Sequence, residues 1–396
     1  MHSQMSRRAV SGLSLIELMI ALLIGTILIL GLVQVFAASR TAYQLSEGLA
    51  RVQENGRFAV DYLQRDIRMA GHFGCVNDQA HAQEDPSGLA TTFAANPTAS
   101  PAVDGLRFDM SVQGFEATST APGDSITLAT PAAGWTDALP TEIDAATTNK
   151  IAGSDILVLR YLAPEGVPVT AIGGTPSAPT FSFDSSRWDV LRSGVSNPGL
   201  FGVADCLHST VFQASNATNG AGGVVAVGGT APLNLSAFSQ VFTSGQANLY
   251  RAESLVYYVG TNANGGNSLY RVRYSAMPGG AGAYGNPEEL VEGIDNMQLL
   301  YGYDRQSDTT LPPTGYIDRQ GVALNGTNST PAAWRRVGAV QIGLLASSPD
   351  RASAPDPANA VSRPKALGVT LIAPSDGRIR SVYQTTIAAR NRLYGN

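Results

Sequence analysis

The chain has 396 residues, of which 14% are charged, and it carries a formal net charge of −5 at pH 7. This charged fraction is well below the ~25% of a typical soluble domain. Because a nucleic-acid interface needs clustered lysine and arginine, we expect no binding to DNA or RNA. The 42 glycines and 22 prolines indicate many turns, and the length allows one large domain or two smaller ones.

A long apolar segment follows a short basic leader. From Leu13 to Ala38 the sequence holds no proline and a single charged residue, Glu17. As a helix of ~1.5 Å per residue, this segment is about 39 Å long, enough to cross a ~30 Å hydrocarbon core with some tilt. Arg7 and Arg8 precede it. The positive-inside bias therefore predicts a cytoplasmic N-terminus, with everything after Ala38 on the far side of the membrane.

The position of Gly12 differs from the cleavage site of an ordinary secretory signal, which follows a shorter apolar region. Here the small residue precedes the apolar run, so cleavage between Gly12 and Leu13 would remove only the leader and keep the hydrophobic helix. Glu17 would then be the fifth residue, about one turn into the helix. An acid inside a membrane helix is costly unless it is paired. We expect Glu17 to meet the free amine of a neighbouring subunit's first residue.

This N-terminal segment resembles the class III signal of type IV pilins and pseudopilins. The residues that carry the resemblance are Gly12, Leu13, Leu15, Ile16 and Glu17, followed by the apolar run to Leu30. The resemblance implies that a prepilin peptidase cuts between Gly12 and Leu13, that Leu13 is N-methylated, and that Glu17 guides assembly into a helical filament. Leu13 and Ser14 replace the more usual Phe and Thr. The alternative is a plain signal anchor that contains an isolated glutamate.

The helix is expected to continue beyond the membrane as an amphipathic segment that ends before Gly71. Its apolar positions recur every three or four residues, at Leu45, Leu49, Val52, Gly56, Ala59, Leu63, Ile67 and Ala70. The opposite faces carry charges that we interpret as solvated, at Glu47, Arg51, Glu54, Arg57, Asp61, Arg65 and Asp66. The sequence therefore predicts one continuous helix from Leu13 to Ala70, about 87 Å long.

The remaining sequence has the pattern of a β-rich domain with short strands between turn residues. Expected strands are Ser125–Ala129, Asp155–Leu162, Ser254–Val259, Ser268–Tyr274, Met297–Tyr303, Val337–Leu345, Gly368–Ile372 and Ile379–Ile387, with a weaker indication at Leu106–Phe115. The third and fourth read as a hairpin, and the apolar strand Val337–Leu345 is expected inside a sheet. Long loops are expected at 209–250, 275–287, 305–332 and 347–366. We see no internal repeat.

The two cysteines, Cys75 and Cys206, are the whole thiol content of the chain. In an oxidising compartment an even pair indicates a disulfide, which here would close a loop of about 130 residues. The alternative is two buried free thiols. Since the cysteines have no CxxC spacing, we expect no redox-active site.

Three C-terminal segments resemble the PilW family of minor pilins. They are EGIDNMQLLYGYD at 292–304, VGAVQIGLLASSP at 337–349 and YQTTIAARNRL at 383–393. The expected fold is thus α+β, with a long pilin helix, half of it transmembrane, packed on a mainly antiparallel β-sheet head. The expected divisions are a leader at 1–12, a transmembrane or filament-core half-helix at 13–38, an amphipathic half at 39–71, and a head at 72–396.

The resemblance implies a structural minor pilin that joins a complex priming pilus assembly and capping the tip. Implied partners are other minor pilins, the major pilin, the prepilin peptidase, the inner-membrane assembly platform and a large tip adhesin. The subunit would sit in the inner membrane with its head in the periplasm, and then in the extracellular pilus. Two alternatives remain open: a large J-like pseudopilin of type II secretion, and a membrane-anchored adhesive domain that never polymerises.

Residues typical of enzymes and metal sites are not arranged in a recognisable motif. The histidines, His2, His72, His81 and His208, show no HExxH or other close ligand spacing. Asp304, Asp308 and Asp318 lie in a polar loop without the glycine and final glutamate of an EF-hand, which leaves open a calcium site of another type. We expect neither an enzyme nor a cofactor.

Overall fold

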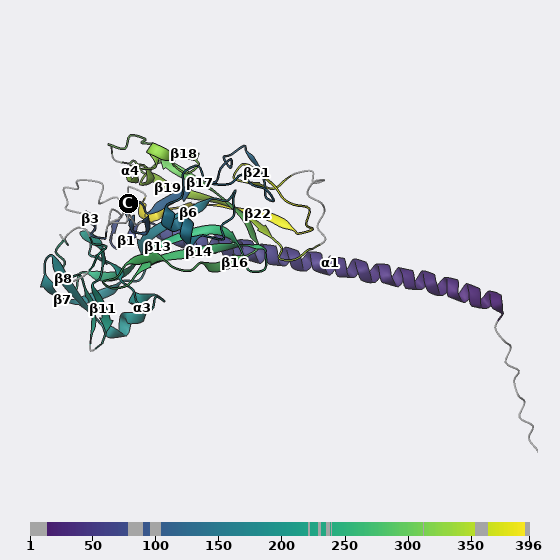
Figure 1. Ribbon diagram of the computed structural model, residues 1–396, viewed down its shortest axis with the longest axis horizontal. Helices are drawn as coiled ribbons and strands as arrows, with labels where there is room; N and C mark the ends of the chain where they lie inside the picture. The colour runs from purple at the N-terminus through teal and green to yellow at the C-terminus, as the bar shows by residue number, and fades with distance from the viewer. Residues whose placement is uncertain are drawn as a thin grey trace, which may run out of the picture.

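The computed structural model shows one long helix that extends from a β-rich head (Figure 1). The structure describes residues 14–77, 90–95, 104–220, 222–228, 231–234, 238, 240–311, 313–352 and 363–392. The leader, the proposed cleavage site at Gly12 and Leu13, and two of the four histidines, His2 and His81, lie outside the described residues.

Helix α1 (Leu15–Met69) runs without interruption for 55 residues. Ser14 caps its beginning, and no proline interrupts it. The helix ends where Ala70 leaves the helical conformation and Gly71 takes a positive φ of 73°, which glycine adopts without steric cost. The described end, at Met69, is one residue before the predicted one.

The second half of α1 packs one face on the head. Its buried residues are Gly48, Val52, Gly56, Ala59, Leu63, Asp66 and Ile67. Two members of the apolar stripe, Leu45 and Leu49, are 44% and 45% exposed, so the head does not cover the stripe at these positions. The interpretation of Asp66 as a solvated residue on the face opposite the stripe is wrong, since Asp66 is only 6% exposed. On the solvated face, Arg51 and Glu47 form an ion pair at 3.4 Å.

A four-stranded antiparallel sheet lies against α1 in the order β18-β17-β19-β22. Its strands are β17 (Ile294–Asp304), β18 (Ile317–Gly321), β19 (Val337–Ser347) and β22 (Arg380–Ala388). The expected strand at Val337–Leu345 is therefore confirmed, and it lies inside the sheet, between β17 and β22. The strand β18 was not expected, because its polar sequence falls in the segment interpreted as a loop.

A larger sheet of 13 strands is built around β13 (Asn248–Thr261), which pairs with β14 (Asn267–Ala276) in the predicted hairpin. The other strands are β3 (Ala90–Phe93), β4 (Val112–Phe115), β6 (Ile156–Leu162), β7 (Val167–Thr175), β8 (Ala178–Phe183), β9 (Leu200–Ala204), β10 (His208–Gln213), β11 (Asn216–Asn219), β12 (Gly223–Ala226), β15 (Gly282–Tyr284) and β16 (Glu288–Glu292). The hairpin register runs from Ser254 opposite Tyr274 to Thr261 opposite Asn267.

Smaller elements complete the head. They are β1 (His72–Phe73), β2 (Val76–Asn77), β5 (Ser125–Thr127), β20 (Lys365–Ala366), β21 (Val369–Ile372), α2 (Thr141–Ala146), α3 (Trp188–Arg192) and α4 (Pro331–Trp334). Among the described strands, only the pairs β3 with β10 and β5 with β21 are parallel. The α+β fold with a mainly antiparallel head is thus confirmed.

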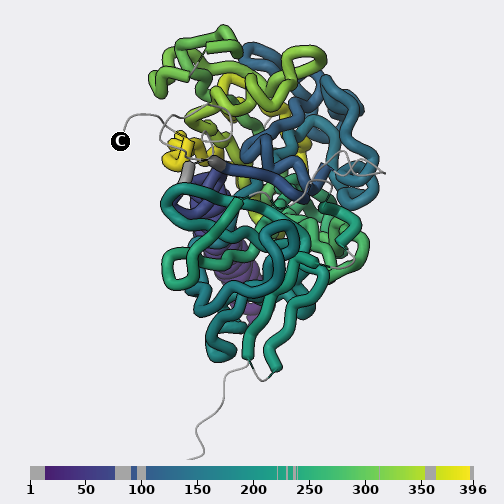
Figure 2. The backbone as a smooth tube through the Cα atoms, turned by 90° about the vertical axis from the view of Figure 1, so that its left-hand side faces the viewer, coloured from purple at the N-terminus to yellow at the C-terminus, as the bar shows by residue number. Residues whose placement is uncertain are grey.

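The expectation of a long loop at 209–250 is wrong, because this stretch contributes to a lobe with its own core. We call residues 163–250 the side lobe. Its core is rich in aromatic side chains, including Phe181, Phe183, Phe201, Phe212, Phe238 and Phe242. The lobe elements β7, β8, β11 and α3 lie at the end of the head away from the free end of α1 (Figures 1 and 2).

Candidate assembly site

The beginning of α1 holds Glu17 in a capping box with Ser14. The backbone N–H of Glu17 donates to Ser14 Oγ at 3.2 Å, and the backbone N–H of Ser14 donates to Glu17 Oε2 at 3.0 Å. This reciprocal arrangement satisfies two N–H groups that a helix start otherwise leaves unpaired. Sequence reasoning missed the role of Ser14, although the spacing Ser-x-x-Glu before an apolar run is the signature of this cap.

The apolar half of α1 makes no contact with the head along most of its length. Its large side chains from Leu15 to Phe36 are 51–80% exposed. Gly25 and Gly31 face open space, since a Cβ built on either would meet no atom within 4 Å. Of the described helices, α1 is the one whose length and composition would allow it to span a membrane. Because exposed apolar area on this scale is unfavourable in water, a membrane or other helices must cover it.

The other end of α1 is anchored in the head by Asp66. The hydroxyl of Tyr257 on β13 donates to Asp66 Oδ2, and Arg271 Nη1 on β14 lies 3.6 Å from the same oxygen. Burial, together with the nearby charge of Asp66, raises the pKa of Tyr257 well above its ordinary value. Tyr257 therefore remains a donor. This buried link joins the helix end to the large sheet and gives the head a defined position on the helix.

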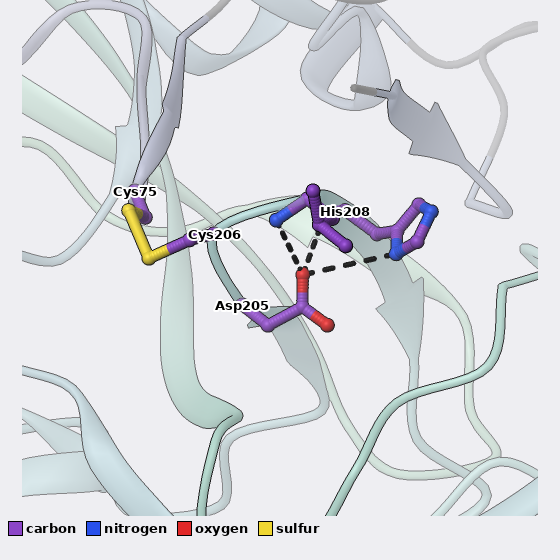
Figure 3. Close-up of a disulfide and its surroundings, with 5 residues drawn as sticks. Cys75, Asp205, Cys206 and His208 are labelled. Carbon is purple, nitrogen blue, oxygen red and sulfur yellow. Dashed lines mark hydrogen bonds and ion pairs between the residues drawn. A yellow bond between two sulfur atoms is a disulfide. The ribbon is translucent and has the colours of Figure 1, made fainter. Parts of the chain in front are cut away.

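A disulfide forms a second link between the helix end and the head (Figure 3). Cys75 follows α1 by six residues, and its partner Cys206 lies between β9 and β10 of the side lobe, 131 residues away in the sequence. The loop around Cys206 is shaped by Asp205, whose Oδ1 accepts hydrogen bonds from the backbone N–H groups of Leu207 (2.7 Å) and His208 (2.6 Å). The alternative of two free thiols does not apply, since both cysteines are bonded.

The other candidate residues have local roles. His72 is half-buried, its Nδ1 lies 2.9 Å from the carbonyl oxygen of Leu162, and burial lowers its pKa. Asp304 and Asp308 accept backbone hydrogen bonds from residues two positions further on, and Asp318 lies 3.6 Å from an arginine. The described part of the chain contains no group of three or more His, Cys, Asp or Glu residues that could hold a metal ion.

Two family models match the chain. One, for the type IV pilus-assembly protein W (PilW), matches residues 256–391, and the other, for the prokaryotic N-terminal methylation motif, matches residues 7–33. Residues 256–391 are therefore similar to the PilW family, and residues 7–33 to the N-terminal methylation motif. The PilW match contains the four-stranded sheet that packs on α1, whereas the methylation motif contains Gly12, Leu13 and Glu17. Both resemblances inferred from the sequence are therefore confirmed.

A solved structure similar to this chain is a type IV-like pilin from Thermus thermophilus. The identity is 23%, the alignment covers 36% of this chain and 70% of that chain, and the TM-score is 0.21. None of the curated proteins compared matches the chain significantly.

Proposed function

We propose that this protein is a minor pilin of the type IV pilus. In this proposal the chain is inserted in the inner membrane through α1, with a cytoplasmic N-terminus and a periplasmic head. Prepilin peptidase cuts between Gly12 and Leu13 and Leu13 is N-methylated, after which the subunit joins a complex that primes pilus assembly and caps the tip. The chain then acts as a structural subunit and not as an enzyme.

The observation that carries the proposal is the division of α1 into two halves of opposite character. The first half is apolar on every side and exposed, and the second half is fixed to the head by apolar packing and by Asp66. A subunit of this shape can exchange lipid for neighbouring helices without rearranging its head. In a filament core, Glu17 would exchange its bond to the Ser14 N–H for a neighbour's N-terminal amine, because an unpaired buried carboxylate is costly.

The partners follow from the same proposal. The apolar half of α1 would contact other minor pilins and the major pilin, and the leader would meet the prepilin peptidase. Two further proposed partners are the assembly platform in the inner membrane and a tip adhesin. The expected boundaries, with a leader at 1–12, a core half-helix at 13–38, an amphipathic half at 39–71 and a head at 72–396, belong to this proposal.

The first experiment determines the N-terminal residue and the mass of the membrane-extracted protein, in cells with and without prepilin peptidase. A protein that begins at Leu13, with one added methyl group, only when the peptidase is present would support the proposal. A protein that retains residues before Leu13 in both strains would exclude it and favour an anchored domain that does not polymerise.

Gene deletion separates a pilus from a type II secretion system. Loss of surface pili and of twitching, with normal protein secretion, is the expected result. Retention of secreted proteins inside the cells, with normal pili, would identify the chain as a pseudopilin instead.

A further inference from the structure

A polar groove lies between α1, at residues 44–51, and the loop after β19, at residues 348–352. This is the end of the head from which the free half of α1 extends (Figure 1). The groove has a volume of about 210 Å³, and its helix and loop walls meet at Gly48, where a Cβ would lie 2.8 Å from that of Ala352. Four of the residues that line it are charged and none is aromatic.

The loop wall of the groove is fixed by hydrogen bonds to the segment before β22. The backbone N–H groups of Ser348 and Ala352 donate to the carbonyl oxygens of Ile379 and Gly377, each at 2.9 Å. Ser348 Oγ accepts the backbone N–H of Ile379 at 3.1 Å and donates to the carbonyl oxygen of Asp350 at 2.8 Å. Because these bonds hold the loop in place, a ligand does not have to order this wall when it binds.

Each wall carries one acid and one arginine that the fold leaves accessible. On the helix, Arg51 and Glu47 pair at 3.4 Å, although 58% and 47% of their side chains are exposed, so this pair is weak. On the loop, Arg351 Nε donates to the carbonyl oxygen of Asp376 at 3.0 Å, and the carboxylate of Asp350 has no hydrogen-bond or ion-pair partner among the described residues. The groove therefore offers two carboxylates and two guanidinium groups to one ligand.

This charge pattern matches a small ligand that contains both a phosphate and a primary ammonium group. The phosphate oxygens would accept hydrogen bonds from the two arginines, and the ammonium would donate to the two carboxylates. A quaternary ammonium group has no N–H to donate, and proteins bind it in cages of aromatic rings. Since no aromatic ring lines the groove, an ethanolamine headgroup fits it better than a choline headgroup.

The position of the groove along α1 agrees with a headgroup that belongs to the membrane. Tyr43 is 68% exposed and lies five residues after Ala38, the end of the apolar run. An exposed tyrosine at such a position is typical of the headgroup layer. Glu47 is four residues beyond Tyr43, or about 6 Å. Helical side chains lean toward the helix N-terminus, which here is toward the membrane, so the helix wall reaches the headgroup layer.

We propose that this groove binds the headgroup of a phosphatidylethanolamine-type lipid while α1 is inserted in the membrane. Arg51 and Arg351 bind the phosphate, and Glu47 and Asp350 bind the ammonium group. The bound lipid fixes the height and rotation of the head on the membrane surface. The inference rests on the proposed function, since it needs α1 to be inserted in a membrane, and it adds a ligand and a lipid preference to that function.

The test reconstitutes the full chain, at one chain per disc, in nanodiscs with equal amounts of phosphatidylethanolamine and phosphatidylcholine. Native mass spectrometry then identifies the lipids that remain bound after release. We expect the ethanolamine lipid to exceed the choline lipid by about threefold, because exposed ion pairs are individually weak. The variant Glu47→Gln with Asp350→Asn should bring this ratio close to one. The matched control, Glu54→Gln with Asp61→Asn, removes two exposed acids of α1 outside the groove and should keep the ratio.

Equal retention of the two lipids by the wild-type chain, or the same loss of preference in both double variants, would overturn the proposal. A further variant, Arg51→Gln with Arg351→Gln, should lower the retention of both lipids, since both contain a phosphate. Unchanged retention in this variant would also overturn the proposal. All the changed side chains are exposed, so the unfolding midpoints of the variants should match that of the wild type.

Membrane insertion and processing at Leu13 are measured separately in cells. A processed and inserted chain without a lipid preference in nanodiscs rejects the groove as a headgroup site and leaves the proposed function standing. A chain that is neither inserted nor processed rejects the proposed function itself.

Discussion

At the residue scale, Glu17 caps the beginning of α1 in the isolated chain and is the residue proposed to contact a neighbouring subunit. In the isolated chain its carboxylate accepts the backbone N–H of Ser14, and it lies far from any residue of the head. Its interactions are therefore local to the first turn of α1. A change at this position should affect what the helix end contacts and leave the remainder of the fold intact.

We expect Glu17→Ala to leave the thermal unfolding of the head unchanged and to reduce incorporation into pili at least tenfold. The reason is that the variant lacks the carboxylate proposed to meet a neighbour's amine. Incorporation is measured as the fraction of the protein in sheared pili, with Asp61→Ala, an exposed acid on the amphipathic half, as the control. Normal piliation of the Glu17 variant would refute the assembly role.

A buried pair of carboxylates, Glu116 and Asp155, is a second residue-scale feature. Asp155 accepts the backbone N–H groups of Ala117 at 2.8 Å and Leu299 at 2.7 Å, and so ties β17 to the segment after β4. Burial, followed by the charge of Asp155, raises the pKa of Glu116 to about 9. Burial also raises the pKa of Asp155 to about 7. The pair therefore binds protons more tightly in the folded protein than in the unfolded chain.

Because of these two carboxylates, we expect the free energy of unfolding to fall as the pH rises from about 4.5 to about 9. The ordinary pKa of Glu116 is 4.5 and the folded value is about 9, so its stabilising contribution is complete below pH 4.5 and falls as the pH rises toward 9. Glu116→Gln cannot ionise, and we expect it to raise the free energy of unfolding at pH 8 by about 1–3 kcal/mol. Denaturant titrations at pH 5 and pH 8 measure this gain, with Glu54→Gln as the exposed control. An equal effect at both pH values would contradict the prediction.

At the scale of elements, the four glycines of α1 serve different purposes. Gly56 is buried against β22, where a Cβ would collide with the ring of Tyr383, and a Cβ on Gly48 would lie 2.8 Å from that of Ala352. Gly25 and Gly31 face open space. The glycines of the second half therefore allow close packing between helix and head, a distinction that the helix sequence alone does not reveal.

We expect Gly56→Ala to lower the free energy of unfolding of the head by about 1–3 kcal/mol, because the added methyl group overpacks the contact with Tyr383. Gly25→Ala, the same change in the exposed half, should have no effect on the head. Chemical denaturation of the detergent-solubilised full chain measures both variants. Equal stability of the two variants would show that the β22 contact is looser than described.

Several strands of the side lobe were missed because their sequences are rich in glycine, threonine and proline. A usable signal was nevertheless present. Val167 and Val169 alternate with exposed residues in β7, and Phe181 and Phe183 alternate with half-buried residues in β8. Such alternation is the mark of a half-buried strand.

At the scale of the whole molecule, the disulfide joins the end of α1 to the side lobe. It closes a loop of 131 residues that contains β2 to β9. Because the PilW match begins only at residue 256, the side lobe lies outside it, and the disulfide is its direct covalent link to the helix end.

Removing this link by Cys75→Ser with Cys206→Ser should lower the free energy of unfolding by about 4–5 kcal/mol, the chain-entropy value for a loop of this length. Denaturant titrations of the full chain in detergent measure this loss. The reduced wild-type protein is the matched control, and it should unfold at the same denaturant concentration as the double variant. A loss of less than about 1 kcal/mol would mean that the side lobe is held by its core alone.

The sequence by itself determined the long helix, its exposed apolar half, the processing motif and most strands within the PilW match. These features are local, because an apolar run, a helix cap or an alternating pattern can be recognised within a short stretch of sequence. Tertiary structure alone decided that Asp66 is buried, that Gly56 meets Tyr383, that Glu116 and Asp155 share an interior site, and that residues 163–250 form a lobe. Each of these depends on chain segments far apart in sequence, whose contact no local pattern can specify.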